Sequence, residues 1–324
     1  MGTYALVIAG AAVLALLLML LQRKKRGIKV RTAFIFGAFA VPLCILVGRG
    51  AFWLCSIEWI RKINASFWDF AGSGYSYMLY GAVLGGFAAA FLAAKISGDS
   101  FGRVADAAAA PAALLIAAGR FGEYLINAGF GLRVVDWFDP YESWSMIAWE
   151  DPEPICRFPF AVQNYYGTWC FSINLWEGIA AIVFLIVLIA MKKRREGGAA
   201  TLVLLMYASC QILFESMRRD NVIIWHFVKA NQLISAMLIM GILIFCWLKL
   251  PQEQRRPKTL WLRILQIVLA AGIIILMEFA LDQKINFLDW MKADLSFMVM
   301  AACCVWMLLT VLPVWRKAWP KLES

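Results

Sequence analysis

Three polar residues recur at helical spacing within an otherwise apolar stretch of the chain. Arg120, Glu123 and Asn127 stand at i, i+3 and i+7, so on a helix they share one face. An arginine inside a membrane helix costs roughly 2.5 to 3.5 kcal/mol on the insertion scale, so such residues usually mark function. A guanidinium group suits a phosphodiester, and a carboxylate orients it or accepts a proton. Two interpretations stay open: a lipid-phosphate site, or mutual neutralisation of Arg120 and Glu123.

A second polar stripe occurs further along the chain. Tyr207, Gln211, Glu215 and Arg218 follow one another at i, i+4, i+8 and i+11, which again places them on one helical face that cannot point at lipid. Together with the first face, this stripe predicts a polar cavity in the outer leaflet. The alternative is hydrogen bonding between helices that serves packing alone.

Two further positions carry polar groups in apolar spans. Arg49 is flanked by Gly48 and Gly50; it either meets a headgroup that approaches over the glycines or reaches the membrane interface with its long side chain. Tyr80 belongs to a span rich in glycine and alanine, whose small residues predict close helix packing. In that span Tyr80 is the one possible polar contributor to a site.

Composition decides what kind of elements position these residues. The 324 residues are 63% hydrophobic and 16% charged, which is more apolar surface than one globular core buries. The net charge of +10 falls in short clusters between apolar runs, a pattern of membrane topology signals, so no nucleic-acid partner is expected. The fold class is therefore predicted to be all-α, a polytopic transmembrane helical bundle.

Apolar runs of about 20 residues predict nine spans. The first is expected to be an anchor with its N-terminus outside, because no positive charge precedes it and a basic cluster at 23–26 follows it. The spans are 4–21, 32–55, 77–94, 107–125, 171–191, 199–216, 233–248, 260–281 and 295–313.

Alternation from an outside N-terminus puts every strong basic cluster and the C-terminus in the cytoplasm. The longest loop, 130–169, then lies outside, and its tryptophans and tyrosines are expected at the lipid headgroup level. Cys156 lies in this loop and Cys170 directly follows it; the two cysteines either form a disulfide or stay free. The other six cysteines lie in or beside apolar segments and have no metal-site spacing.

No metal site or cofactor is expected. The single histidine, His226, excludes a histidine dyad and is interpreted as an interfacial loop residue. The chain also shows no Gly-rich phosphate loop, soluble domain or internal repeat.

Several motifs occur in the order of a known family. Gly119-Arg120-Phe121-Gly122-Glu123-Tyr124-Leu125-Ile126-Asn127 followed by Gly131-Leu132-Arg133 resembles the signature G-R-x-G-N-F-x-N-G-E, with its later G-R, of the prolipoprotein diacylglyceryl transferases. Val47-Gly48-Arg49, Asn174-Leu175-Trp176-Glu177, the stripe at 207–218 and Asn231-Gln232-Leu233-Ile234-Ser235 resemble further motifs of that family. The resemblance covers seven spans, so we expect a transferase-like core at 1–253 and a two-helix membrane extension at 254–324.

The resemblance implies an enzyme of the bacterial cytoplasmic membrane. It would move a diacylglyceryl group from phosphatidylglycerol or a related phospholipid to the lipobox cysteine of a prolipoprotein signal peptide. Arg120 and Arg218 are then expected to hold the lipid phosphate, while Glu123, Glu215 or Tyr80 assists deprotonation of a thiol whose pKa is normally about 8.5. The other expected headgroup contacts are Arg49, Asn127, Tyr207 and Gln211.

The sequence departs from the family pattern at three positions. Tyr80 stands where the family has a histidine, Gln211 where it has an arginine, and Glu123 where it has an asparagine; the signature glutamate has no clear equivalent. These departures keep an alternative open, a divergent paralogue that binds lipid or lipoprotein without the standard catalysis or that uses another acceptor. A transporter ranks last, because no polar stripe continues to the cytoplasmic side and no halves repeat.

Overall fold

The computed structural model describes residues 2–56, 77–134, 158–165, 167–218, 224–225, 228–281, 288, 291 and 293–321. Cys156 and His226 lie outside these ranges, as does most of the loop 130–169. Both alternatives for Cys156 and Cys170 therefore still stand, and the interfacial histidine and the aromatic loop stay predictions.

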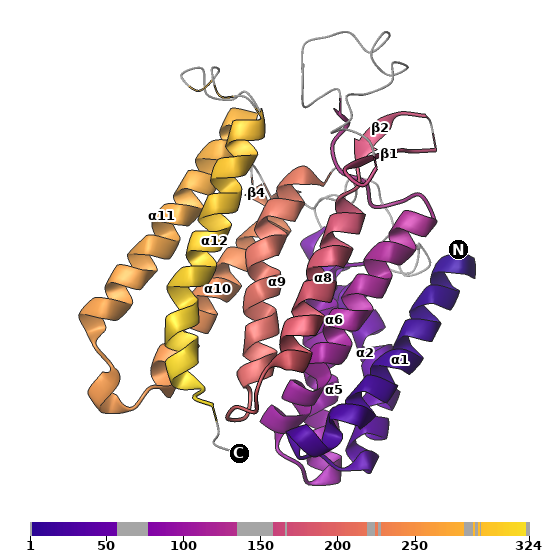
Figure 1. The fold of residues 1–324 in the computed structure, drawn as a ribbon, viewed down its shortest axis with the longest axis vertical. Helices are drawn as coiled ribbons and strands as arrows, with labels where there is room; N and C mark the ends of the chain where they lie inside the picture. The colour runs from indigo at the N-terminus through magenta and orange to yellow at the C-terminus, as the bar shows by residue number, and fades with distance from the viewer. Residues whose placement is uncertain are drawn as a thin grey trace.

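Long helices dominate the described residues, and nine of these helices are long and apolar enough to cross a membrane (Figure 1). The nine predicted spans and the all-α polytopic bundle are confirmed. The helices are α1 (Gly2–Arg26), α2 (Val30–Cys55), α5 (Leu79–Ser97), α6 (Phe101–Leu125), α8 (Ile173–Ala190), α9 (Gly198–Met217), α10 (Ala230–Lys249), α11 (Pro257–Leu281) and α12 (Ala293–Ala318).

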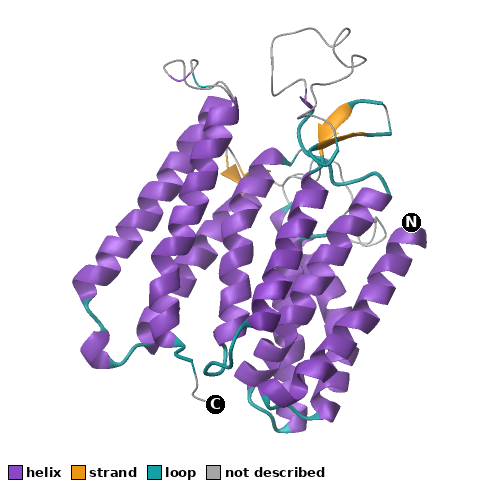
Figure 2. Ribbon diagram, in the orientation of Figure 1, coloured by secondary structure: helices purple, strands orange, loops and turns teal. Residues whose placement is uncertain are grey.

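The helices run side by side, and the two chain termini lie at opposite ends of the bundle (Figure 1). Two short antiparallel hairpins, β1 (Ala161–Gln163) with β2 (Trp169–Phe171) and β3 (Ile224–Trp225) with β4 (Val228–Lys229), lie toward the end where α1 begins (Figure 2). We call this the hairpin end, and the end that holds the C-terminus the basic end, because the last turn of α1 there reads Arg23, Lys24, Lys25 and Arg26.

The outward faces of the helices carry large apolar side chains. Leu6, Leu21, Trp261 and Met298 are 75%, 80%, 69% and 68% exposed. Such exposure would be unfavourable in water, but in a bilayer the surrounding solvent is itself apolar. The bundle is therefore built to face lipid.

Helices α2 and α5 approach each other over glycines, as the small residues of α5 predicted. A Cβ atom on Gly81 would lie 2.6 Å from the carbonyl oxygen of Val47, and one on Gly85 would lie under 3.0 Å from the backbone of Leu43. Only glycine allows two backbones this close. The contact holds Tyr80, next to Gly81, against the centre of the bundle.

The start of α9 is capped from another helix. Its own preceding residue, Gly197, provides no side chain, and the buried carboxylate of Asp106 on α6 instead accepts hydrogen bonds from the backbone N–H groups of Gly197 (2.9 Å), Ala199 (2.8 Å) and Ala200 (2.9 Å). These are N–H groups that a helix start leaves unpaired, and a negative charge is favourable there. The first turn of α9, the helix that carries the predicted polar stripe at 207–218, is therefore held in place by α6.

The last two helices pack against α9 and α10 to form the largest apolar cluster. Leu205, Leu243, Ile267, Met300 and Met307 are each at most 1% exposed within it. At the basic end, the indole N–H of Trp319 donates to the carbonyl oxygen of Glu196 (3.0 Å), and that of Trp315 donates to the carbonyl oxygen of Gly198 (3.1 Å). α12 is thus tied to the loop that precedes α9.

Candidate functional site

Arg120 lies in the last two turns of α6, near the hairpin end. Its Nη1 atom donates to Glu123 Oε1 at 2.9 Å and to Oε2 at 2.8 Å, and its Nε atom forms an ion pair with Glu177 of α8. The pairing of Arg120 with Glu123, one of the two interpretations of their spacing, is therefore present. It does not stand alone, because a second helix contributes a second carboxylate.

Arg218 reaches the same carboxylates from the end of α9. Its Nη1 atom lies 3.2 Å from Glu177 Oε2, and its Nη2 atom lies 3.7 Å from Glu123 Oε2. Arg120, Glu123, Glu177 and Arg218 thus form one group, called here the charge cluster. Their side chains are 11%, 23%, 4% and 9% exposed, so the charges are shielded from solvent and depend on one another.

Backbone hydrogen bonds hold the three helix ends that supply the charge cluster. The N–H of Gly131 donates to the carbonyl oxygen of Phe171 (2.8 Å), the N–H of Leu132 donates to that of Met217 (2.9 Å), and the N–H of Phe171 donates back to that of Leu132 (3.0 Å). The segment that leaves α6 is thereby tied both to the start of α8 and to the end of α9. Charged side chains on fixed backbones are what a preorganised site requires.

A second group of polar side chains surrounds Glu215 on α9. Its carboxylate accepts hydrogen bonds from Gln211 Nε2 (3.1 Å) and from Asn231 Nδ2 of α10 (3.0 Å). The hydroxyl groups of Tyr80 and Ser235 are also hydrogen-bonded to each other, and Ser235 donates to the carbonyl oxygen of Asn231 (2.6 Å). We call these five residues the Glu215 group; it joins α5, α9 and α10.

Tyr207 lies between the two groups. Its ring meets the ring of Tyr80 edge to face, with 5.5 Å between centroids, and its hydroxyl lies within electrostatic range of both Arg120 and Glu215. Tyr207, Gln211, Glu215 and Arg218 thus all face the interior, as their spacing predicted. Gln211 Oε1 and Asn231 Oδ1 are buried acceptors without a donor among the described residues, so the Glu215 group has capacity to receive hydrogen-bond donors.

Two predicted site residues do not join these groups. α6 ends at Leu125, and Asn127 is exposed with a left-handed φ of 61°, so the expected shared helical face of Asn127 with Arg120 and Glu123 is wrong. Asparagine is one of the few non-glycine residues that readily adopt this conformation at a helix end. Within the described ranges no ion pair links Arg49 to the charge cluster; its half-buried side chain lies on α2.

Sequence reasoning missed Glu177 as a site residue. It is the most buried member of the charge cluster, and it bridges both arginines. A signal was present, since Glu177 is the lone charge in the apolar span at 173–190, and a lone carboxylate in a membrane helix requires a partner.

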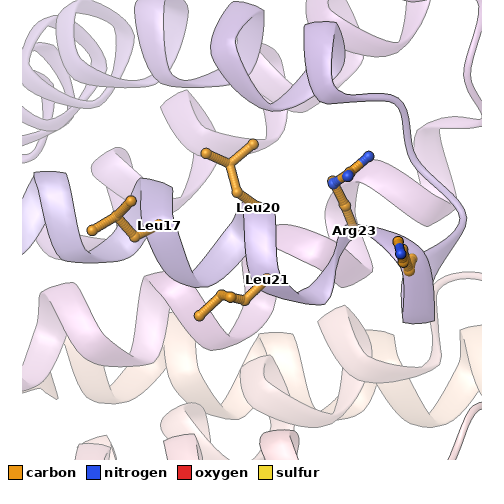
Figure 3. Close-up of a pocket in the computed structure, with 5 residues that line it drawn as sticks. Leu17, Leu20, Leu21 and Arg23 are labelled. Carbon is orange, nitrogen blue, oxygen red and sulfur yellow. The ribbon is translucent and has the colours of Figure 1, made fainter.

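The chain also has a surface hollow on α1 that has no part in this site (Figure 3). Leu17, Leu20, Leu21, Arg23 and Lys24 line it, and it lies toward the basic end. All five residues belong to α1, and none of the five is acidic. Apolar side chains followed by basic ones are what a membrane helix shows where it leaves the hydrocarbon.

The chemistry open to the site follows from its charges. Two guanidinium groups from different helices converge in a shielded place, where electrostatic interactions are stronger than in water. A phosphodiester can replace a carboxylate as the guanidinium partner, because both offer paired oxygens. Among the described residues no group of three His, Cys, Asp or Glu side chains is arranged to hold a metal ion.

Comparison with known proteins supports the family resemblance of the sequence motifs. The family model described as prolipoprotein diacylglyceryl transferase matches residues 1–248. The chain is similar to the phosphatidylglycerol–prolipoprotein diacylglyceryl transferase of Bacillus velezensis, with 25% identity over 73% of this chain and 83% of the relative. It is also similar to the enzymes of that name from Listeria monocytogenes serotype 4b (26% identity, 76% and 86%) and Halalkalibacterium halodurans (23% identity, 69% and 73%).

Proposed function

Because the chain belongs to the prolipoprotein diacylglyceryl transferase family, we propose that it moves a diacylglyceryl group from phosphatidylglycerol to the lipobox cysteine of a prolipoprotein. The observation that carries this proposal is the convergence of Arg120 and Arg218 from two helices onto shared carboxylates. A lipid phosphate needs such a pair of cations at the place where its ester bond breaks.

In the proposed reaction, the cysteine thiolate attacks the glycerol carbon that carries the phosphate. A carbon–sulfur bond forms, the carbon–oxygen bond to the phosphate breaks, and glycerol phosphate leaves with the electron pair. Arg120 and Arg218 stabilise the negative charge on the leaving phosphate. The thiol proton passes to a base of the protein and then to the leaving group or to solvent.

Glu123 is the proposed base. Its side chain is 23% exposed, against 4% for Glu177, so within the charge cluster it is the carboxylate that a substrate reaches most easily. When a phosphate takes over Arg120, the Glu123 carboxylate is released from that guanidinium and its oxygens are available to the thiol proton. Glu215 and Tyr80 are proposed as supporting groups, with the Tyr80 hydroxyl acting as a hydrogen-bond donor.

The remaining headgroup contacts are proposed from their positions. Tyr207 and Gln211 stand on the buried stripe of α9, beside Arg218 and Glu215. Arg49 and Asn127 are half-buried and exposed respectively, so they are proposed to meet the parts of the headgroup nearer the interface.

We propose that the protein resides in the bacterial cytoplasmic membrane with its N-terminus outside and its C-terminus in the cytoplasm. The basic last turns of α1 and α12 support this orientation, since basic clusters stay on the cytoplasmic side. The hairpin end and the charge cluster then belong to the outer half of the bilayer, where a prolipoprotein signal peptide presents its cysteine. The transferase-like core is proposed to be 1–253, and the extension 254–324.

The test is expression in cells depleted of their own diacylglyceryl transferase, together with a reporter that carries a lipobox cysteine. We expect the reporter to gain a diacylglyceryl group, seen by mass spectrometry, and the same reporter with serine at that position to gain none. Unmodified reporter in the presence of correctly inserted protein would overturn the transferase proposal.

The second candidate is a paralogue that binds lipid without the standard transfer. It is favoured by the neutral balance of the charge cluster, in which each guanidinium already has carboxylate partners. Thermal stabilisation of the purified protein by phosphatidylglycerol, without any reporter lipidation, is the result that selects it over the enzyme.

A further inference from the structure

Helix α11 lies beyond the matched residues 1–248, yet it places a carboxylate among the polar residues near the site. Glu278 is in the last turn of α11, at the hairpin end, and its side chain is only 14% exposed. An acidic residue in a membrane helix is unfavourable unless it is paired. Its partners therefore indicate what it does.

Those partners all come from the ends of α9 and α10. Glu278 Oε1 accepts hydrogen bonds from the Ser216 hydroxyl and from Gln232 Nε2 (2.6 Å), and Glu278 Oε2 lies 3.8 Å from Lys229 Nζ. Gln232 Nε2 also lies 2.6 Å from the Ser216 hydroxyl. The carboxylate thus contacts three side chains at once, and one of them is a cation.

Lys229 in turn caps the end of α9. Its ammonium group donates to the carbonyl oxygens of Glu215 (3.1 Å) and Ser216 (2.9 Å), which belong to the last turn of the helix. Carbonyl groups at a helix end lack partners within the helix, and a positive charge there is favourable. A lysine without a counter-ion would be costly in this shielded position.

The capped turn carries the two charged site residues of α9. Glu215 lies at one side of this turn, where Asn231 donates to its carboxylate, and Arg218 follows directly after the helix. A site needs its groups within about 0.5 Å of the productive geometry. The position of both groups therefore depends on what holds the end of α9.

We infer that Glu278 is a positioning residue for the site, which acts through Lys229 on the last turn of α9. The carboxylate holds the ammonium group, the ammonium group holds two carbonyl oxygens, and these fix the backbone that carries Glu215 and Arg218. The extension then contributes to the geometry of the site, through the position of Glu215 and Arg218. The kinetic part of this inference rests on the proposed transferase function, whereas the structural part does not.

The test compares Glu278→Gln with a matched control, Glu253→Gln, in the full-length protein in nanodiscs. Glutamine keeps the acceptor for Ser216 and Gln232 and removes the charge that holds Lys229. Glu253 directly precedes the extension and is exposed in the short 3-10 helix Gln252–Gln254, before the start of α11, whereas Glu278 is in the last turn of α11. We expect faster hydrogen exchange at 212–218 only in Glu278→Gln, and a roughly 10- to 100-fold lower kcat toward the lipobox reporter.

A double-mutant cycle separates positioning from general stability. Lys229→Met should resemble Glu278→Gln, and the double variant should be no worse than Lys229→Met alone, because both changes interrupt one chain of contacts. Glu278→Asp, which keeps the charge, should recover most of the activity, and Lys229→Met replaces Glu278→Gln if that variant does not insert.

The outcomes are distinct for the two proposals. An inactive wild-type protein overturns the proposed function, and the exchange at 212–218 then decides the positioning role by itself. Unchanged exchange at 212–218 in Glu278→Gln overturns the inference, whether or not the wild type is active. Additive effects in the cycle overturn the route through Lys229.

Discussion

In the charge cluster, the two arginines share the same two carboxylate partners. Glu177 contacts both arginines and is almost fully buried, whereas Glu123 contacts the same two arginines and is the most exposed member. A buried carboxylate that bridges two cations fixes their separation. We therefore propose that the more exposed carboxylate, that of Glu123, is the one that an arriving phosphate displaces first.

Arg120→Ala should abolish the lipid-dependent activity and leave membrane insertion intact. The loss should be about 10²- to 10³-fold in kcat, the range found when one group that stabilises a developing oxyanion is removed. The measurement is initial-rate lipidation of the reporter, with insertion followed by fractionation. Arg31→Ala, at the exposed start of α2, is the matched control, and normal activity of Arg120→Ala would contradict the assigned role.

Glu123→Gln should lower both kcat and KM, for two different reasons. Removing one carboxylate from beside Arg120 and Arg218 leaves the guanidinium groups freer for phosphate, so KM for phosphatidylglycerol should fall about five-fold, equivalent to about 1 kcal/mol. Loss of the base should lower kcat about 10²- to 10⁴-fold. Steady-state kinetics in mixed micelles measure both, and an undiminished kcat would move the role of base to Glu215.

At the scale of elements, α9 is held at both ends by side chains from other elements. Asp106 of α6 caps its first N–H groups, and Lys229 caps carbonyl oxygens of its last turn. α9 is also flanked by α6 and α8 on one side and by α10 and α12 on the other. Its polar stripe is consequently fixed in height and rotation relative to Arg120 and Glu177.

The contact between α2 and α5 should tolerate no side chain at Gly85. Gly85→Ala introduces a Cβ atom under 3.0 Å from the backbone of Leu43, which cannot move aside as a side chain would. The expected cost is about 1 to 3 kcal/mol, as for other overpacked interiors, visible as a lower Tm in detergent. Gly86→Ala is the control, because its nearest atom is the Cys44 sulfur at 3.8 Å; equal Tm values for the two variants would refute the close approach.

At the scale of the whole molecule, the extension is tied to the rest of the bundle at both ends. Glu278 of α11 meets α9 and α10 at the hairpin end. At the basic end, Trp315 of α12 and Trp319, directly after α12, meet the first residue of α9 and the loop before it. The apolar cluster between these points is continuous. Movement of the extension is therefore coupled to the position of α9.

Trp319→Ala should destabilise the protein by about 3 to 5 kcal/mol, because a side chain that is 2% exposed is lost together with its hydrogen bond to Glu196. The Tm in detergent should fall clearly. Trp261→Ala, at a lipid-facing position that is 69% exposed, should leave the Tm nearly unchanged. A comparable decrease in both variants would show that the docking of α12 contributes little.

The sequence by itself determined the elements and several of their faces. Nine spans follow from apolar length, the close packing of α5 follows from Gly81 and Gly85, and the inward stripe from Tyr207 to Arg218 follows from a spacing of about 3.6 residues. All of these properties are local, because hydrophobic length, residue size and helical period act within one segment.

Only the tertiary structure decided which charges meet. It brought Glu177 of α8 between Arg120 and Arg218, it placed Glu278 of α11 against Lys229, and it ended α6 before Asn127. Such pairings depend on how helices that are far apart in the sequence are shifted along their axes and rotated relative to one another. These relative positions arise from helix packing over glycines, from helix caps and from backbone hydrogen bonds between helix ends. No residue spacing within a single segment encodes them.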